Sequence, residues 1–227
     1  ERDLADLVRR AVREAAAGTE TLAAHIETAL DRAGLARLFR IRQMASPVLA
    51  RMSETRRSLQ IIEDGCVPLE GLSVYIAGVR AASAETGVPV AIFGHAGDAH
   101  VHVNAQPDVT RPDWEQDLRR LFDGVTDLLV RLGGTLSGEH GDGRLRAGVL
   151  ERVFGPELIR VFADIKRAYD PHGILNPGVI IPAPDWDPLR HLKVGPDAAP
   201  IPEPIARRLR EIEQQAGWAV AKWELAG

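Results

Sequence analysis

The sequence has very little cysteine. Cys66 is the only one among 227 residues, which excludes an internal disulfide framework and any cysteine-based zinc or iron–sulfur motif. A lone cysteine fits a reducing compartment, and we expect a cytoplasmic protein. No apolar run approaches the roughly 18 residues that a membrane-spanning helix needs, and no signal peptide opens the sequence. The sequence therefore predicts no membrane span.

Basic residues give no surplus of positive charge. Arginine and lysine together number 28 against 32 acidic residues, so the net charge is -4, and only Lys166, Lys193 and Lys222 are lysines. A chain with this balance has no electrostatic reason to bind nucleic acid or an acidic membrane surface. The first residue is Glu1, directly in a helical pattern, so we expect the chain to be part of a longer protein.

Histidine, in contrast, is concentrated. Four of the seven histidines lie in two glycine-rich segments, 94–104 and 137–143, each of which follows an apolar run. The segments read Gly-His-Ala-Gly-Asp-Ala-His-Val-His-Val-Asn and Ser-Gly-Glu-His-Gly-Asp-Gly. The plainer interpretation is that these histidines pack and form hydrogen bonds beside tight turns. Because four occur between glycines, we favour a functional site.

The first segment predicts a β-hairpin. The run 90–93 is rich in strand-forming residues, Gly97 and Asp98 signal a turn, and the residues after the turn alternate. Because side chains in a strand alternate between faces, His100, His102 and Asn104 should share one face.

This hairpin suggests a metal site. The turn should bring His95 near the histidines of the second strand, and Glu139 from the later segment could supply a carboxylate. Two of these imidazoles could give a divalent metal two nitrogen ligands, and the carboxylate would complete the protein's share. Two imidazoles and one carboxylate with open positions are typical of a catalytic rather than a closed structural site.

The remaining pattern predicts an α+β fold, with helices covering one face of a mostly antiparallel sheet. Residues 1–182 should form one domain, and 183–227 should form a proline-rich linker and a last helix. Trp218 and Trp223 could dock this helix. No Gly-x-Gly-x-x-Gly pattern follows a strand, so the sequence lacks that signature of a dinucleotide-binding domain. The expected helices are 4–15, 21–33, 35–52 with an interruption at Ser46-Pro47, 69–86, 112–132, 156–169 and 205–215, and the expected strands outside the hairpin are 58–64 and 135–137.

Three motifs in order carry a resemblance. The two histidine segments are followed by 170–178, which reads Asp-Pro-His-Gly-Ile-Leu-Asn-Pro-Gly. Over about 40–182 the chain resembles the carboxy-terminal domain of the FAD-linked oxidases, a family that includes D-lactate dehydrogenases, the glycolate oxidase flavin subunit and D-2-hydroxyglutarate dehydrogenase. The resemblance implies a substrate domain whose FAD is carried mostly by an amino-terminal portion outside this chain. Alone, it should bind flavin weakly and turn over little.

The implied reaction is oxidation of a D-2-hydroxy acid to the 2-oxo acid, with hydride passing to the flavin. His140 is expected to be the general base, because an imidazole titrates near working pH. The metal, zinc or manganese, would be held by His95, His102 and Glu139 and would act as a Lewis acid. Glu139 and Asn176 are expected near the cofactor, and an iron–sulfur protein is a possible electron-transfer partner.

The resemblance also implies how the substrate is held. A planar guanidinium matches a carboxylate, and Arg42 is the arginine at the family's position. Ser46, one helical turn further on, could add a hydroxyl contact, and Asn104 would orient the substrate. No lysine stands where the family has a further donor, and Arg56 or Arg57 would substitute for it.

Two other classes remain open at this point. A free-standing metallohydrolase could use the same two histidines and glutamate with water in the fourth position. A non-catalytic interaction module could bind a partner through the proline-rich tail and the terminal tryptophans.

Overall fold

The computed structural model describes residues 6, 7, 10, 27–51, 55–190, 192, 194, 195 and 198–214. The chain divides into two compact units, Glu1–Leu49 and Ala50–Gly227, and each is described by itself. Most of the expected helix 4–15 lies outside the described residues, and so do Trp218 and Trp223.

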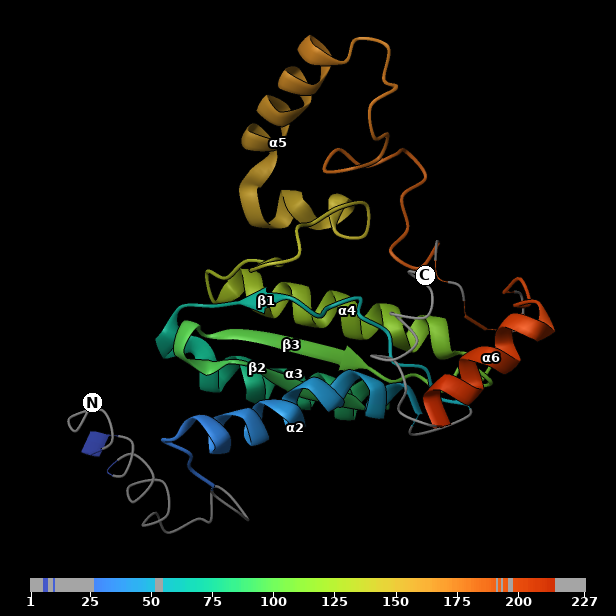
Figure 1. The fold of residues 1–227 in the computed structure, drawn as a ribbon. Coiled ribbons are helices and arrows are strands. Elements are labelled where there is room, and N and C mark those ends of the chain that lie inside the picture. Colours follow the sequence, from blue (N-terminus) through green and yellow to red (C-terminus); the bar gives the residue numbers. More distant parts are fainter. Residues whose placement is uncertain are drawn as a thin grey trace. The chain divides into compact units, whose positions relative to one another are not determined.

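The first described helix, α2, spans Arg32–Arg51 (Figure 1). Two expectations were wrong here: Gly34 does not end a helix, and Ser46-Pro47 does not interrupt one, since α2 runs through all three residues. The Asp31 side chain accepts a hydrogen bond from the Gly34 amide at 2.8 Å. An aspartate placed in this way caps the start of a helix, so Asp31 is the N-cap of α2. Residues 27–30 before it are not helical.

The second unit contains a three-stranded antiparallel sheet with the order β1-β3-β2, so β3 is the central strand (Figure 1). Its strands are β1 (Gly65–Cys66), β2 (Val90–His95) and β3 (His100–Ala105). The predicted hairpin is confirmed: β2 and β3 pair along their whole length and are joined by the short 3-10 helix η2 (Ala96–Asp98).

The other two expected strands were wrong. Only isolated bridges occur in 58–64 and 135–137, Leu59 with Ala105 and Thr135 with Cys66. In the first segment the chain bends at Ile61 and Ile62 and turns at Glu63 and Asp64, so the pairing that begins at Leu59 does not continue as a ladder.

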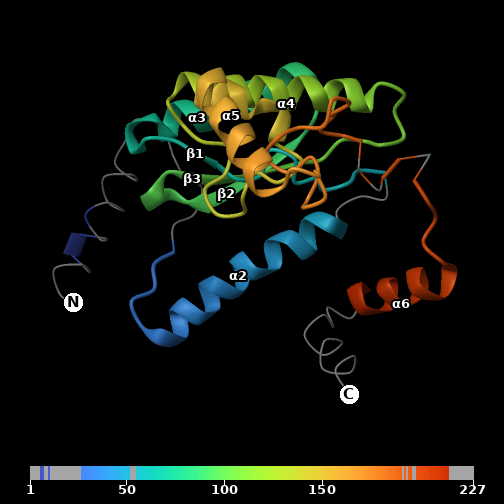
Figure 2. The same cartoon turned by 90° about the horizontal axis from the view of Figure 1, so that it is seen from above.

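Helices cover one face of the sheet (Figure 2). After the 3-10 helix η1 (Leu69–Gly71), α3 (Leu72–Thr86) packs against α4 (Trp114–Arg131). Both helices were predicted from their apolar spacing. Leu118 and Leu121 of α4 are fully buried, as is Val103 of β3. Each such side chain stabilises the fold by roughly 1.5–3 kcal/mol, so this layer anchors β3 and the residues on its other face. The α+β class is confirmed.

The last helices follow the 3-10 helix η3 (Ala147–Val149). Helix α5 (Leu150–Tyr169) is kinked at Gly155, whose φ of 78° is left-handed, and Pro156 then starts the straight part that the sequence predicted. Helix α6 spans Glu203–Gln214, close to its predicted bounds. The straight part of α5 carries an exposed apolar stripe made of Leu158, Val161, Ile165 and Tyr169. No described helix is both long enough and apolar enough to cross a membrane.

Candidate active site

The hairpin gathers three histidines. His95 ends β2 and pairs directly with His100, the first residue of β3. His102 lies two residues further, while the intervening Val101 and the following Val103 pack into the core, as their alternation predicted. The imidazoles of His100 and His102 lie with their centroids 4.6 Å apart, and both side chains are buried.

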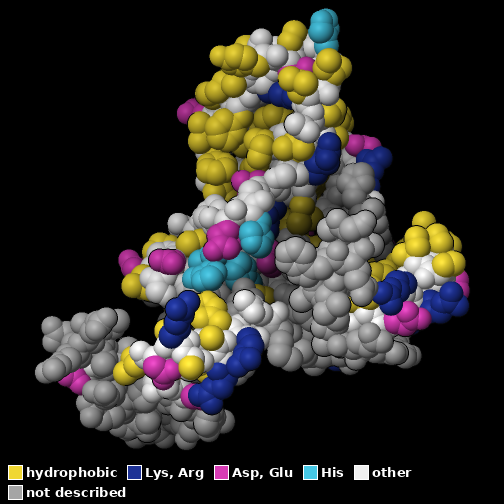
Figure 3. All heavy atoms as spheres, in the orientation of Figure 1, with side chains coloured by type: hydrophobic (Ala, Val, Ile, Leu, Met, Phe, Trp, Pro, Cys, Tyr) yellow, Lys and Arg dark blue, Asp and Glu magenta, His cyan; other side chains and the backbone are white. Residues whose placement is uncertain are grey.

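Glu139 lies at the centre of this group. Its Oε1 is 3.3 Å from His95 Nε2 and 3.5 Å from His100 Nδ1, and its Oε2 is 3.6 Å from His140 Nε2 and 3.9 Å from His102 Nε2. The Glu139 side chain is 46% exposed, and His95 and His140 are exposed to a similar degree. The group is therefore open to solvent on one side, where histidine and acidic side chains gather on the surface (Figure 3).

Two adjacent acidic residues accept hydrogen bonds from the ring nitrogens of three histidines. His100 Nε2 lies 2.7 Å from Asp64 Oδ1, and His140 Nδ1 lies 2.7 Å from Glu63 Oε2. His102 Nδ1 lies 3.2 Å from the Glu63 carbonyl oxygen. Carbonyl and carboxylate oxygens only accept, so each of these ring nitrogens carries a hydrogen, and in the neutral form of the ring the other nitrogen keeps its lone pair. Those free nitrogens are the ones that face Glu139.

Asp64 also fixes the loop that delivers Glu139. Its carboxylate accepts from Ser137 Oγ at 2.6 Å, from His140 N at 2.8 Å and from Glu139 N at 3.2 Å. Burial alone raises the pKa of the Asp64 carboxyl, but the hydrogen bonds from Ser137, His140 and His100 outweigh it and hold the pKa far below its usual range. Asp64 is therefore an ionised acceptor inside the fold.

The electrostatics favour a neutral imidazole at His102. Burial lowers the pKa of His102 and exceeds the opposing effect of Glu63, while His100 lowers it further. The neutral form of histidine is the one that ligates metals.

The sequence interpretation gave no role to Glu63, Asp64 or Ser137, and it did not include His100 in its set of metal ligands. The signal for the acidic pair was its position, since Glu63 and Asp64 directly follow the buried residues Ile61 and Ile62. Acidic side chains rarely become buried unless they are paired, so an acidic pair at the end of an apolar run is informative.

The candidate substrate residues lie in different places. Asn104 is buried in β3, and its Oδ1 accepts from Ser58 Oγ at 3.0 Å. Its Nδ2 has no hydrogen-bond partner among the described residues, and a buried donor of this kind suits a ligand oxygen. Arg42 and Ser46 lie in α2, but their side chains fall outside the described part of the chain.

Asn176 lies in the exposed loop after α5, with a φ of 47°. This loop is tied to the glycine-rich turn near Glu139, because Ile180 N donates to the Gly143 carbonyl at 3.2 Å. Arg144 Nε also donates to the Pro177 carbonyl at 3.0 Å.

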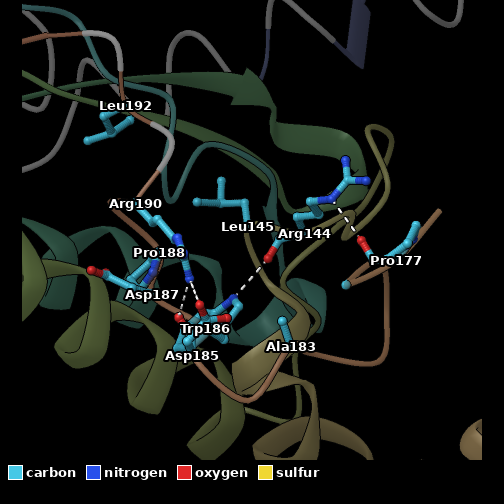
Figure 4. Close-up of a pocket in the computed structure, with 11 residues that line it drawn as sticks. Arg144, Leu145, Pro177, Ala183, Asp185, Trp186, Asp187, Pro188, Arg190 and Leu192 are labelled. Carbon is cyan, nitrogen blue, oxygen red and sulfur yellow. Dashed lines mark hydrogen bonds and ion pairs between the residues drawn. The ribbon is translucent and has the colours of Figure 1, made fainter. Parts of the chain in front are cut away.

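A cavity of about 610 Å³ adjoins the same loop (Figure 4). Pro177 and Gly178 line it on one side and Trp186 on another, and the Trp186 indole donates to the Arg144 carbonyl at 2.8 Å. None of the clustered histidines lines this cavity.

The donor set suits a divalent metal. His95, His100, His102 and Glu139 each offer one ligand atom, and these atoms all lie within 4.8 Å of one another. His100 and His102 are bonded through their other ring nitrogens to oxygen acceptors. Imidazoles supported in this way, together with one exposed carboxylate, are the usual chemistry of a catalytic zinc or similar centre. The three predicted ligands are thus close enough to share one ion.

The fold and the site define a class of protein. A profile described as "FAD linked oxidases, C-terminal domain" matches residues 1–180, and the chain belongs to this family.

Curated relatives agree with this assignment. The chain is 36% identical over 157 residues to D-2-hydroxyglutarate dehydrogenase of Escherichia coli, covering 69% of this chain and 15% of that protein. It is 31% identical to glycolate oxidase subunit GlcD of Bacillus subtilis, covering 69% and 32%, and 34% identical to D-lactate dehydrogenase of Archaeoglobus fulgidus, covering 56% and 28%. The chain spans less than a third of the length of each of these relatives.

Proposed function

We propose that the chain is the substrate domain of a flavoprotein that oxidises a D-2-hydroxy acid to the 2-oxo acid, with FAD held mainly by another part of the protein. One observation carries the proposal: in a member of the FAD-linked oxidase family, four imidazoles surround the half-exposed carboxylate of Glu139. The printed names of the relatives, which refer to hydroxyglutarate, glycolate and lactate, support this substrate class.

The proton-transfer role falls to His140. Its Nδ1–H donates to Glu63, which leaves the lone pair on Nε2, and the ring is 47% exposed. A neutral imidazole oriented by a carboxylate is suited to accept a proton from a substrate hydroxyl at Nε2. Removal of that proton makes departure of the hydride easier.

Cofactors would supply the rest of the chemistry. Zinc or manganese would be held by His95, His102 and Glu139 and would polarise the substrate oxygens, while FAD would accept the hydride. Asn176, in the exposed loop tied to Gly143, would contact the flavin.

Substrate binding would use donors that match a hydroxy acid. The free Nδ2 of Asn104 would donate to a substrate oxygen, and Arg42 with Ser46 would hold its carboxylate.

We further propose that the substrate domain comprises 1–182 and that 183–227 is a segment made of a proline-rich linker and a C-terminal helix. The start of this segment is tied to the domain, because Asp187 accepts a hydrogen bond from Arg119 of α4 at 2.8 Å.

The single cysteine supports a location in the reducing cytoplasm. An iron–sulfur protein could serve as the electron acceptor.

The alternative functions are not favoured. A free-standing metallohydrolase or a non-catalytic module would give no reason for a match to FAD-linked oxidases over most of the chain.

The test is flavin reduction in the whole protein. Anaerobic mixing with D-lactate, glycolate or D-2-hydroxyglutarate should bleach the flavin absorbance, and the L-enantiomers of the chiral acids should not.

In His140→Ala, kcat should fall by about 10²–10⁴-fold because the general base is lost, while flavin content stays unchanged. Wild-type turnover in that variant would remove His140 as the base, and no bleaching by any 2-hydroxy acid would refute the proposed reaction.

A further inference from the structure

His100 occupies a place built for its ring. The side chain is buried, and its ring stacks on His95 with centroids 5.5 Å apart. A Cβ atom at Gly138 would lie only 2.9 Å from His100 Cδ2 and Nε2, so only glycine leaves room for the ring. A ring packed this closely keeps one orientation.

Asp64 determines which nitrogen of His100 faces the site. It accepts from His100 Nε2 at 2.7 Å and is itself held by Ser137 Oγ and His140 N. The hydrogen of the ring therefore lies on Nε2, and the lone pair on Nδ1 points to the side of Glu139, 3.5 Å away. A carboxylate behind an imidazole is the usual support of a metal-bound histidine.

We propose that His100 is a third imidazole ligand of the divalent metal, with Asp64 as its positioning residue. This inference rests on the proposed function and extends its metal site from two histidines and Glu139 to three histidines and Glu139. The four donor atoms lie within 4.8 Å of one another, as one shared ion requires.

A consequence is a choice of metal. Three imidazoles and one carboxylate favour zinc over manganese, because manganese binds nitrogen donors more weakly and prefers oxygen ligands. Zinc with four protein donors can still expand to five-coordination and accept a substrate oxygen.

The experiment uses the whole protein stripped of metal and refilled with zinc chloride. Zinc affinity is measured by competition with a chromogenic chelator, and the imidazoles around zinc are counted by X-ray absorption spectroscopy. The variants are His100→Gln, whose amide can still donate to Asp64, and Asp64→Asn. His172→Gln, at an exposed histidine outside the cluster, is the matched control.

We expect three imidazoles around zinc in the wild type and in His172→Gln. In His100→Gln we expect two, with zinc affinity at least about tenfold weaker, and in Asp64→Asn a loss of about 10–100-fold. Circular dichroism confirms folding, and if Asp64→Asn fails to fold, the His100→Gln comparison decides.

Unchanged affinity and an unchanged imidazole count in His100→Gln would overturn the proposal, as would a wild type that binds no zinc or shows only two imidazoles. Flavin bleaching by 2-hydroxy acids is recorded on the same samples. A wild type that bleaches but lacks the third imidazole would sink this inference and leave the proposed function standing.

Discussion

At the scale of single residues, Glu63 and Asp64 act mainly on different histidines although they are neighbours. The Glu63 carboxylate lies 2.7 Å from His140 Nδ1 and only 3.4 Å from His102 Nδ1, whereas Asp64 bonds His100 and the loop of Glu139. A change at the Glu63 side chain should therefore affect the proposed base more than the proposed metal site.

Glu63→Gln should impair turnover more than metal binding. The substitution removes the charge that orients His140, while the backbone carbonyl that bonds His102 remains and only the longer contact of the carboxylate with His102 is lost. We expect kcat to fall by about 10–100-fold and zinc affinity to fall by a smaller factor. Steady-state kinetics and the chelator assay measure the two effects. Glu70→Gln, at an exposed residue of η1, is the control, and a larger effect on zinc than on kcat would contradict the division of roles.

Gly138→Ala should destabilise the fold through His100. The added methyl would lie 2.9 Å from a buried ring that its bond to Asp64 prevents from moving. We expect the free energy of unfolding in urea to drop by about 1–3 kcal/mol. Gly97→Ala is the matched control, because a Cβ there meets nothing within 4 Å. Equal stability of the two variants would show that the His100 ring is free to shift.

At the scale of elements, hydrophobic spacing was a reliable guide where an element buries one face. The hairpin, α3, α4 and the straight part of α5 were all predicted in this way. The helix start at Asp31 was missed because Gly34 was interpreted as a terminator, although the preceding aspartate provides a cap. The strand expected at 58–64 does not form, because an apolar run does not reveal where the chain bends.

The end of α5 should respond to acid. Hydrogen bonds from Lys166 Nζ, at 2.5 Å, and from the amides of Leu175 and Ile174 lower the pKa of the Asp170 carboxyl below its ordinary value of 3.8, despite burial. Because the pKa is lower in the folded state, the stabilisation is present above about pH 4 and disappears as the pH falls through the folded-state pKa.

Asp170→Asn should therefore lower the free energy of unfolding at pH 7, and its difference from the wild type should shrink as the pH falls below about 4. Chemical denaturation across pH 2.5–7 measures this. Asp164→Asn, at an exposed residue of the same helix, should show little difference at any pH. A constant difference for Asp170→Asn would mean that the carboxylate charge is not what stabilises the turn.

At the scale of the whole molecule, the candidate site was predictable in part. Local hairpin structure predicted that His95 and His102 are neighbours, whereas Glu139 and His140 were placed beside them through the resemblance to the FAD-linked oxidases. Asp64 and Glu63 could not be placed, since each lies more than 35 residues from the side chain it supports. Pairings between such distant segments depend on the tertiary fold, which periodicity does not encode.

The apolar stripe on α5 has a practical consequence. Val161 is 49% exposed and Ile165 54%, and with Leu158 and Tyr169 they form one continuous face. The chain produced on its own should therefore self-associate as its concentration rises. Sedimentation velocity should show this trend, Val161→Gln with Ile165→Gln should weaken it, and Arg160→Gln, at a neighbouring exposed residue, should not. A preparation of this domain by itself would consequently stay homogeneous only in dilute samples, or with the apolar face of α5 covered or replaced by polar residues.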